Sequence, residues 1–144
     1  ESPESHDYGC LMAMLPADLR KQIFDWSLEN IPDFHLGPGG REFRHHITIK
    51  HGFTDGSPEI VQALKALLVR HGPIAARLKG MSLFTSGYGK WQNEDGDVLK
   101  IDVESQDLVE LNKVISESFE CEDKHPEFLP HCTVAYLLPE VSAC

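Results

Sequence analysis

Arg44-His45-His46-Ile47-Thr48-Ile49-Lys50-His51 has a weaker copy later in the chain, Pro130-His131-Cys132-Thr133-Val134-Ala135-Tyr136-Leu137. Each copy places a histidine and a threonine two residues apart within a run of β-forming residues. Successive side chains of a strand point to opposite faces, so the two polar groups share one face and the residues between them share the other. We therefore expect two strands that each present an imidazole and a hydroxyl from a rigid hydrophobic back.

The pairing is unusual for this composition. The sequence contains 8 histidines and only four threonines, and two of those threonines follow a histidine by two places. Buried structural histidines are the first alternative. A zinc site is the second, because His45, His46 and His51 are close in sequence and zinc binds imidazole. In a strand, however, His45 and His46 point to opposite faces, so we expect no metal site here.

The motifs His46-Ile47-Thr48-Ile49 and His131-Cys132-Thr133-Val134 resemble the two signatures of the 2H phosphoesterase superfamily, which includes the LigT-like RNA 2′,3′-cyclic phosphodiesterases. The resemblance extends over nearly the whole chain. Residues 97–104 and 130–137 are also similar to a branch often found in phage genomes, including as a domain of larger virion proteins. The family often has proline before the first histidine, where this chain has His45, and Pro130 keeps that pattern in the second motif.

The resemblance implies an α+β fold with two antiparallel sheet lobes that flank a central cleft and helices outside. The periodicity of the sequence indicates strands at 9–15, around His46, at 74–85, at 97–104 and at 131–137. It indicates helices at 17–29, from Ser57-Pro58-Glu59 to His71, and at 106–119. Residues 30–43 are expected to be an irregular loop, either a surface connection or a lid over the site. Residues 9–15 read as a strand buried on both faces, and 97–104 as a half-exposed strand.

Length and composition fit one domain over residues 1–144, with residues 1–8 flexible. The apolar content of 41% is typical of a globular protein, no apolar run is long enough to span a membrane, and no secretion signal is visible. We expect a cytoplasmic monomer, in the host cytoplasm if the gene belongs to a phage. The chain begins at Glu1 rather than Met, which favours a domain of a larger polypeptide or a processed product. Four cysteines without close pairs are expected to be free thiols.

The formal net charge of −10 bears on the partner. Long nucleic acids are held by many lysine and arginine contacts to phosphates, and such an acidic chain repels them at range. A small nucleotide or a short oligonucleotide is therefore the expected substrate.

The two histidine–threonine pairs suit hydrolysis of a phosphodiester. One imidazole can remove a proton while the other supplies one, because the unperturbed histidine pKa lies near 6.5. Thr48 and Thr133 can donate hydrogen bonds to the non-bridging oxygens. This chemistry needs no cofactor and no metal. We predict His46, Thr48, His131 and Thr133 as catalytic residues.

Further substrate contacts are predicted at five residues. Lys50 shares the strand face of His46 and could bind phosphate, with an ordinary exposed lysine as the alternative. Arg44 lies beside the first motif. Tyr88, Lys90 and Trp91 suit stacking on a base, or the packing of aromatic side chains over a turn.

Two classes of function follow. The first is an enzyme that opens a cyclic phosphate or cuts a short phosphodiester, with a 2′,3′-cyclic phosphate, a 2′-5′ linkage or a cyclic oligonucleotide defence signal as substrate. The second is a nucleotide-binding module of a larger phage protein without turnover. Intact histidine and threonine in both motifs favour the enzyme. The sequence does not decide the linkage, or which histidine is the acid.

Overall fold

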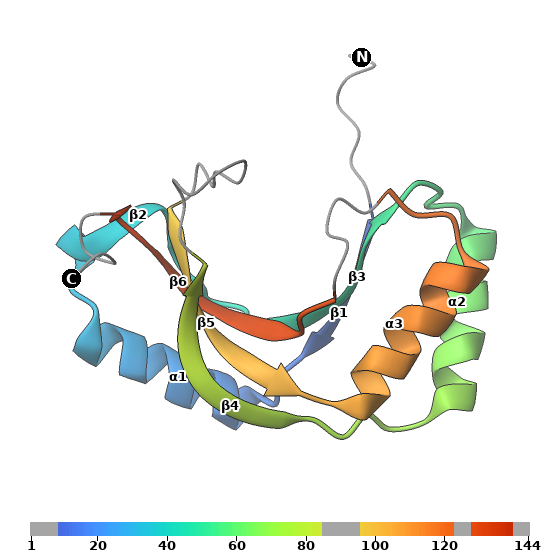
Figure 1. The fold of residues 1–144 in the computed structure, drawn as a ribbon, viewed down its shortest axis with the longest axis horizontal. Helices are drawn as coiled ribbons and strands as arrows, with labels where there is room; N and C mark the ends of the chain where they lie inside the picture. The colour runs from blue at the N-terminus through green and yellow to red at the C-terminus, as the bar shows by residue number, and fades with distance from the viewer. Residues whose placement is uncertain (1–8, 85–95, 123–127, 140–144) are drawn as a thin grey trace, which may run out of the picture. The chain divides into compact units, whose positions relative to one another are not determined.

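A computed structural model describes residues 9–84, 96–122 and 128–139 of the chain (Figure 1). The strands are β1 (Gly9–Met14), β2 (Leu36–Arg41), β3 (His46–Phe53), β4 (Arg77–Phe84), β5 (Asp97–Glu104) and β6 (His131–Leu137). The helices are α1 (Ala17–Asn30), α2 (Pro58–His71) and α3 (Gln106–Ser118), with a short 3-10 turn at Asp33–His35. The expected α+β class is confirmed.

The described strands form one sheet in the order β1-β3-β6-β5-β4, and β2 also pairs with β6. The β6 strand runs antiparallel to β3, to β2 and to β5. The strand of the second motif therefore has hydrogen-bonded neighbours along both edges, and one of these neighbours carries the first motif.

The chain divides into two compact units. One contains Ala13–Ile47, Leu78–Val103 and His131–Cys144, and the other contains Glu1–Met12, Thr48–Arg77 and Glu104–Pro130. We call them the histidine unit and the helical unit, because the first holds both motif histidines and the second holds α2 and α3. The β3 strand passes from the histidine unit into the helical unit after Ile47.

The core of the histidine unit lies behind the motif strands. Cys132, Val134 and Ala135 of β6 have no exposed surface, and Ile47 of β3 is also buried. Helix α1 packs against β6 and buries Ile23. Ile47, Cys132 and Val134 are the interleaved hydrophobic positions of the two motifs, so the predicted two-faced strands are confirmed.

In the helical unit, α2 and α3 lie side by side (Figure 1). Both helices begin as the sequence predicts, because the Ser57 and Ser105 hydroxyls accept hydrogen bonds from the backbone N–H of Ile60 and Leu108. Pro58 occupies the first turn of α2, where a missing N–H costs nothing. Along α3, Leu108, Leu111 and Ile115 are completely buried. Spacings of three and four residues put these side chains on one helix face.

The predicted loop at 30–43 is wrong over most of its length. It contains the 3-10 turn and β2, which pairs with β6 at Leu36↔Leu137 and Arg41↔Ala135. Backbone groups make this pairing, so the Gly-Pro-Gly-Gly stretch takes part without a side-chain pattern that would reveal it. The Arg41 guanidinium donates to the carbonyl oxygens of Ser27 and Ile31 at the end of α1 and to Asp33.

Two exposure predictions are also wrong. The β1 strand lies at the edge of the described sheet, with Met12 and Met14 45% and 44% exposed, so it is not buried on both faces. The β5 strand lies between β6 and β4 and is mostly buried, including Lys100 at 7% exposure. Residue alternation reports which side chains share a face, but not whether a neighbouring strand covers them.

Candidate functional site

The register of β3 and β6 brings the two motifs together. Ile47 and Cys132 are partners in this antiparallel pair, which sets His46 opposite Thr133. Residues directly opposite each other point to the same face, about 5 Å apart at Cβ, and diagonal neighbours such as His46 and His131 lie roughly 7–8 Å apart. His46, His131 and Thr133 are all partly exposed, whereas the residues between them are buried. Two imidazoles and a hydroxyl of the histidine unit thus share the face opposite its core.

Two residues just before β3 contact the His46 ring. Its Nδ1 lies 2.7 Å from the carbonyl oxygen of Arg44, and the Glu42 carboxylate is 4.0 Å away. A carbonyl oxygen can only accept, so Nδ1 carries the hydrogen in this contact. In neutral His46 the lone pair is then on Nε2, the nitrogen that could remove a proton.

Thr48 follows His46 by two residues on β3 and is also partly exposed. Its side chain hydrogen-bonds to the thiol of Cys10 on β1. Burial raises the pKa of the Cys10 thiol, and the hydrogen bond to Thr48 lowers this pKa by a smaller amount.

Neighbouring strands surround His131. Asp102 of β5 is its direct partner across the antiparallel pair. The ring of Phe84 on β4 lies edge-to-face with the imidazole, with 5.3 Å between centroids. A carboxylate beside an imidazole is a common way to fix the orientation of a working histidine.

The Asp102 carboxylate is itself held in place. Its Oδ1 accepts hydrogen bonds from the Ser82 hydroxyl and from the Lys100 ammonium, which also donates to Ser82. The Lys100 nitrogen stands 4.3 Å from the centre of the Phe84 ring. Lys100 lowers the pKa of Asp102 most, burial raises it, and Ser82 and His131 lower it further. Sequence reasoning missed these residues, although Lys100 and Asp102 alternate with hydrophobic residues along β5.

The cysteine on the buried side of the second motif is unreactive. Burial raises the pKa of the Cys132 thiol to about 11, so this group stays protonated and serves packing. Cys10 and Cys132 are free thiols, in agreement with the prediction. Cys144 lies outside the described residues.

Of the five further residues predicted to contact the substrate, the structure describes two, Arg44 and Lys50. Arg44 is exposed beside His46. Lys50 is only 8% exposed, in contrast to the partly exposed His46 and Thr48 of the same strand. Its role in phosphate binding stays a prediction. Tyr88, Lys90 and Trp91 lie outside the described residues.

His45 faces the core, as the strand alternation predicts. It has no exposed surface, and neither ring nitrogen has a hydrogen-bond partner among the described residues. Burial lowers the pKa of His45, with Glu42 raising it and His46 and Arg20 lowering it by smaller amounts. His51 is exposed. His45 and His51, the other two members of the alternative zinc cluster, therefore lie in different surroundings.

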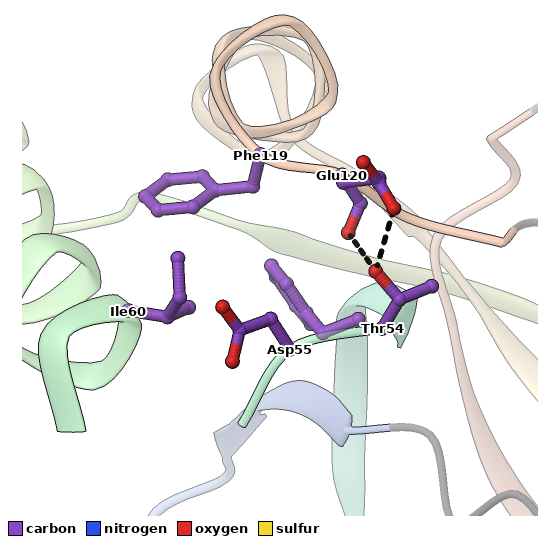
Figure 2. Close-up of a pocket in the computed structure, with 6 residues that line it drawn as sticks. Thr54, Asp55, Ile60, Phe119 and Glu120 are labelled. Carbon is purple, nitrogen blue, oxygen red and sulfur yellow. Dashed lines mark hydrogen bonds between the residues drawn. The ribbon is translucent and has the colours of Figure 1, made fainter. Parts of the chain in front are cut away.

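A small pocket lies in the helical unit (Figure 2). Its volume is about 180 Å³, and it is lined by Phe53, Thr54, Asp55, Ile60, Phe119 and Glu120. The Thr54 hydroxyl donates to both the backbone oxygen and the carboxylate of Glu120. Nucleotide-sized ligands occupy cavities of roughly 300 Å³ or more, so this pocket is small for the predicted substrate.

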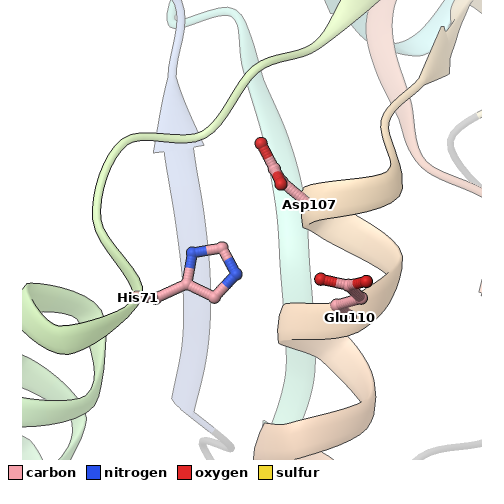
Figure 3. A group of neighbouring side chains, drawn as sticks. All are labelled: His71, Asp107 and Glu110. Atoms are coloured by element: carbon pink, nitrogen blue, oxygen red, sulfur yellow. The ribbon is translucent and has the colours of Figure 1, made fainter.

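The helical unit also contains a cluster of possible metal ligands, His71, Asp107 and Glu110 (Figure 3). Their donor atoms lie within 4.8 Å of one another. The Asp107 Oδ2 already accepts a hydrogen bond from the backbone N–H of Ala75. Surface carboxylates often meet a histidine without binding an ion, and we assign no metal to this cluster.

No helix among the described residues is long and apolar enough to cross a membrane.

Comparison with known proteins gives one family and a related fold. Residues 16–143 match the family model described as the 2′-5′ RNA ligase superfamily. One similar solved structure is described as the crystal structure of a phosphoesterase, with a TM-score of 0.58 and 22% sequence identity over 90% of this chain and 73% of that chain. No curated protein matches the chain.

Proposed function

Because the chain belongs to the 2′-5′ RNA ligase superfamily, the LigT-like 2H phosphoesterases, we propose that it hydrolyses a 2′,3′-cyclic phosphate or a short oligonucleotide phosphodiester. The proposed catalysts are His46 and His131 as the acid–base pair, with Thr48 and Thr133 as hydrogen-bond donors to phosphate. The proposal is for a phosphoric diester hydrolase without a metal cofactor.

The observation that carries the proposal is the pairing of Ile47 with Cys132. This single register sets the His46 imidazole opposite the Thr133 hydroxyl and puts His131 diagonal to His46 on the same face. Two strands far apart in the sequence thereby present acid–base groups toward one small anion.

The proposed reaction consumes one water molecule and needs no other co-reactant. One histidine takes a proton from water while the oxygen of that water bonds to phosphorus. The bond from phosphorus to the leaving ribose oxygen breaks, and the second histidine gives that oxygen a proton. Each proton transfer contributes roughly 10² to 10⁴-fold, and the threonine hydroxyls stabilise the negative charge on the non-bridging oxygens.

The net charge of −10 supports a small substrate. A mononucleotide or a short oligonucleotide brings few phosphates, so it meets little repulsion and needs few basic contacts. A binding module without turnover would also be expected to bind a small nucleotide. Only a measurement of turnover therefore distinguishes the enzyme from the binding module.

The deciding experiment is a screen of purified protein, with divalent ions chelated, against three substrates: a 2′,3′-cyclic nucleotide, a 2′-5′-linked dinucleotide and a cyclic oligonucleotide. Mass spectrometry should detect a product one water heavier than the cyclic substrate, or two fragments whose masses sum to the 2′-5′-linked dinucleotide plus one water, in at least one reaction. The His46→Ala/His131→Ala double variant, prepared in parallel, should form no product. Tight binding of a nucleotide without product would support the binding module instead.

A further inference from the structure

We propose that Asp102 is a positioning residue for His131, and that the pair makes His131 the general acid and leaves His46 as the general base. This inference rests on the proposed function, because it assigns roles within the same two-histidine site. Asp102 itself is not proposed to touch the substrate.

Asp102 and His131 are direct partners of the antiparallel β5–β6 pair, so both side chains rise from the same face of the sheet. Among the described residues of the histidine unit, the charged or titratable groups near this pair include Lys100, beside Asp102 on β5, and His46, diagonal to His131 on β3. They also include Glu42, whose carboxylate lies 4.0 Å from the His46 Nδ1. From β4, the Phe84 ring contacts His131 and the Ser82 hydroxyl donates to Asp102, and neither side chain carries a charge.

Two hydrogen bonds hold the Asp102 carboxylate in place. Ser82 and Lys100 both donate to Oδ1, and Lys100 is buried over the Phe84 ring. These contacts leave Oδ2 as the oxygen that can accept from an imidazole. They also hold the carboxylate ionised, since a nearby ammonium favours the charged form. A fixed carboxylate can then hold the ring of His131 in one orientation.

The positive charge of His131 lowers the pKa of Asp102. By linkage the Asp102 carboxylate must favour the imidazolium form of His131 by the same interaction. Lys100 opposes this effect by repulsion, so Asp102 and Lys100 should move the titration of His131 in opposite directions.

His46 has the complementary surroundings. Its Nδ1 donates to the Arg44 carbonyl, which fixes the neutral tautomer with the lone pair on Nε2. In the forward reaction His46 would therefore accept the proton of water, and His131 would give its proton to the leaving oxygen.

The test is an NMR titration of protein labelled with ¹⁵N-histidine, which needs no substrate. His131→Gln assigns the signals. Asp102→Asn should lower the protonation midpoint of His131 by about one pH unit, whereas Lys100→Met should raise it. Asp25→Asn, on the surface of α1, is the matched control and should change nothing. A His131 midpoint that stays unchanged, or that moves in the same direction in both variants, would overturn the inference.

A second measurement uses turnover. If His131 is the acid, Asp102→Asn should move the basic limb of the rate profile to lower pH and leave the acidic limb in place. A shift of the acidic limb alone would reverse the two roles and overturn the proposal. If wild-type protein turns over no substrate, the proposed function fails, while the NMR titration still decides the relationship between Asp102 and His131.

Discussion

Lys100 of β5 and Thr133 of β6 lie directly opposite one another, which extends the row begun by His46 on β3 across three strands of the histidine unit. A cation, a hydroxyl and an imidazole therefore share one line across the sheet. The adjacent row on β6 and β5 holds His131 and Asp102. The predicted catalytic face is thus built from two cross-strand rows rather than from two isolated motifs.

We expect His46→Ala and His131→Ala each to lower turnover by about a hundredfold or more while the fold is kept, because each removes one proton transfer. The double variant should lose less than the product of the two single losses, since the residues act as a unit. Steady-state kinetics on all three variants, with circular dichroism as the folding control, measures this. Wild-type rates in either single variant would point to another site or a contaminant.

The rate should follow a bell-shaped dependence on pH, because one imidazole must be neutral while the other is protonated. EDTA should leave the rate unchanged, since protons and hydroxyl donors do here what a metal would do by polarising water. Activity that disappears with EDTA and returns only on addition of a divalent ion would refute the mechanism.

His45 should make the protein less stable at mildly acidic pH. Burial lowers the pKa of His45 from the ordinary 6.5, so below that pH the unfolded chain binds a proton that the folded chain resists. Stability should fall by up to about 1.4 kcal/mol per pH unit between 6.5 and the lowered pKa, and the term is absent above 6.5. Urea unfolding at pH 5.5 and 7.5 measures it.

The matched variants for this prediction are His45→Leu and His51→Gln. The first should shrink the difference between the two pH values, because it removes the buried imidazole. The second changes an exposed histidine and should keep the difference as in wild type. An equal difference in His45→Leu would assign the acid sensitivity to other groups.

Gly52→Ala should lower the free energy of unfolding of the helical unit by about 3 kcal/mol or more. Gly52 has φ +89°, and an added Cβ would stand 1.9 Å from the backbone oxygen of Glu122. At Gly56 an added Cβ would meet no atom of a non-neighbouring residue within 4 Å, so Gly56→Ala provides the control. Thermal unfolding of both variants compares them. A Gly52→Ala melting temperature equal to that of the control would mean that the backbone there is free to adjust.

Arg41→Met should lower the free energy of unfolding by about 1.5–3 kcal/mol, because the buried guanidinium satisfies two carbonyl oxygens at the end of α1. Arg77→Met removes an exposed pair with Glu104 and should cost about 0–1 kcal/mol. Urea denaturation of the two variants gives the comparison. Similar losses in both would show that the α1 carbonyls find other partners.

Sequence alone predicted the features that depend on local periodicity. The two-residue spacing of His46 and Thr48, and of His131 and Thr133, predicted the two-faced strands. The capping residues Ser57 and Ser105 predicted the starts of α2 and α3. Both kinds of signal act within a few residues, so they survive any tertiary arrangement.

Features that depend on strand neighbours were missed. Lys100 and Asp102 read as a solvent face, because only the pairing of β5 with β6 and β4 reveals that they adjoin His131. β2 was missed for the same reason, since its pairing with β6 is made by backbone groups. Lys50 has the same strand parity as His46 and yet is buried. Alternation alone does not tell a buried side chain from an exposed one on the same face.

The central position of β6 also bears on how quickly the protein folds. The β3–β6 pairing joins residues 47 and 132, so most of the chain must be looped before it can form. Such contacts gain nothing until the loop is closed, and sheets dominated by them fold in milliseconds to seconds rather than microseconds. Helices α2 and α3 depend on local contacts and can form earlier. We therefore expect the predicted catalytic face to be among the last parts of the molecule to form during refolding.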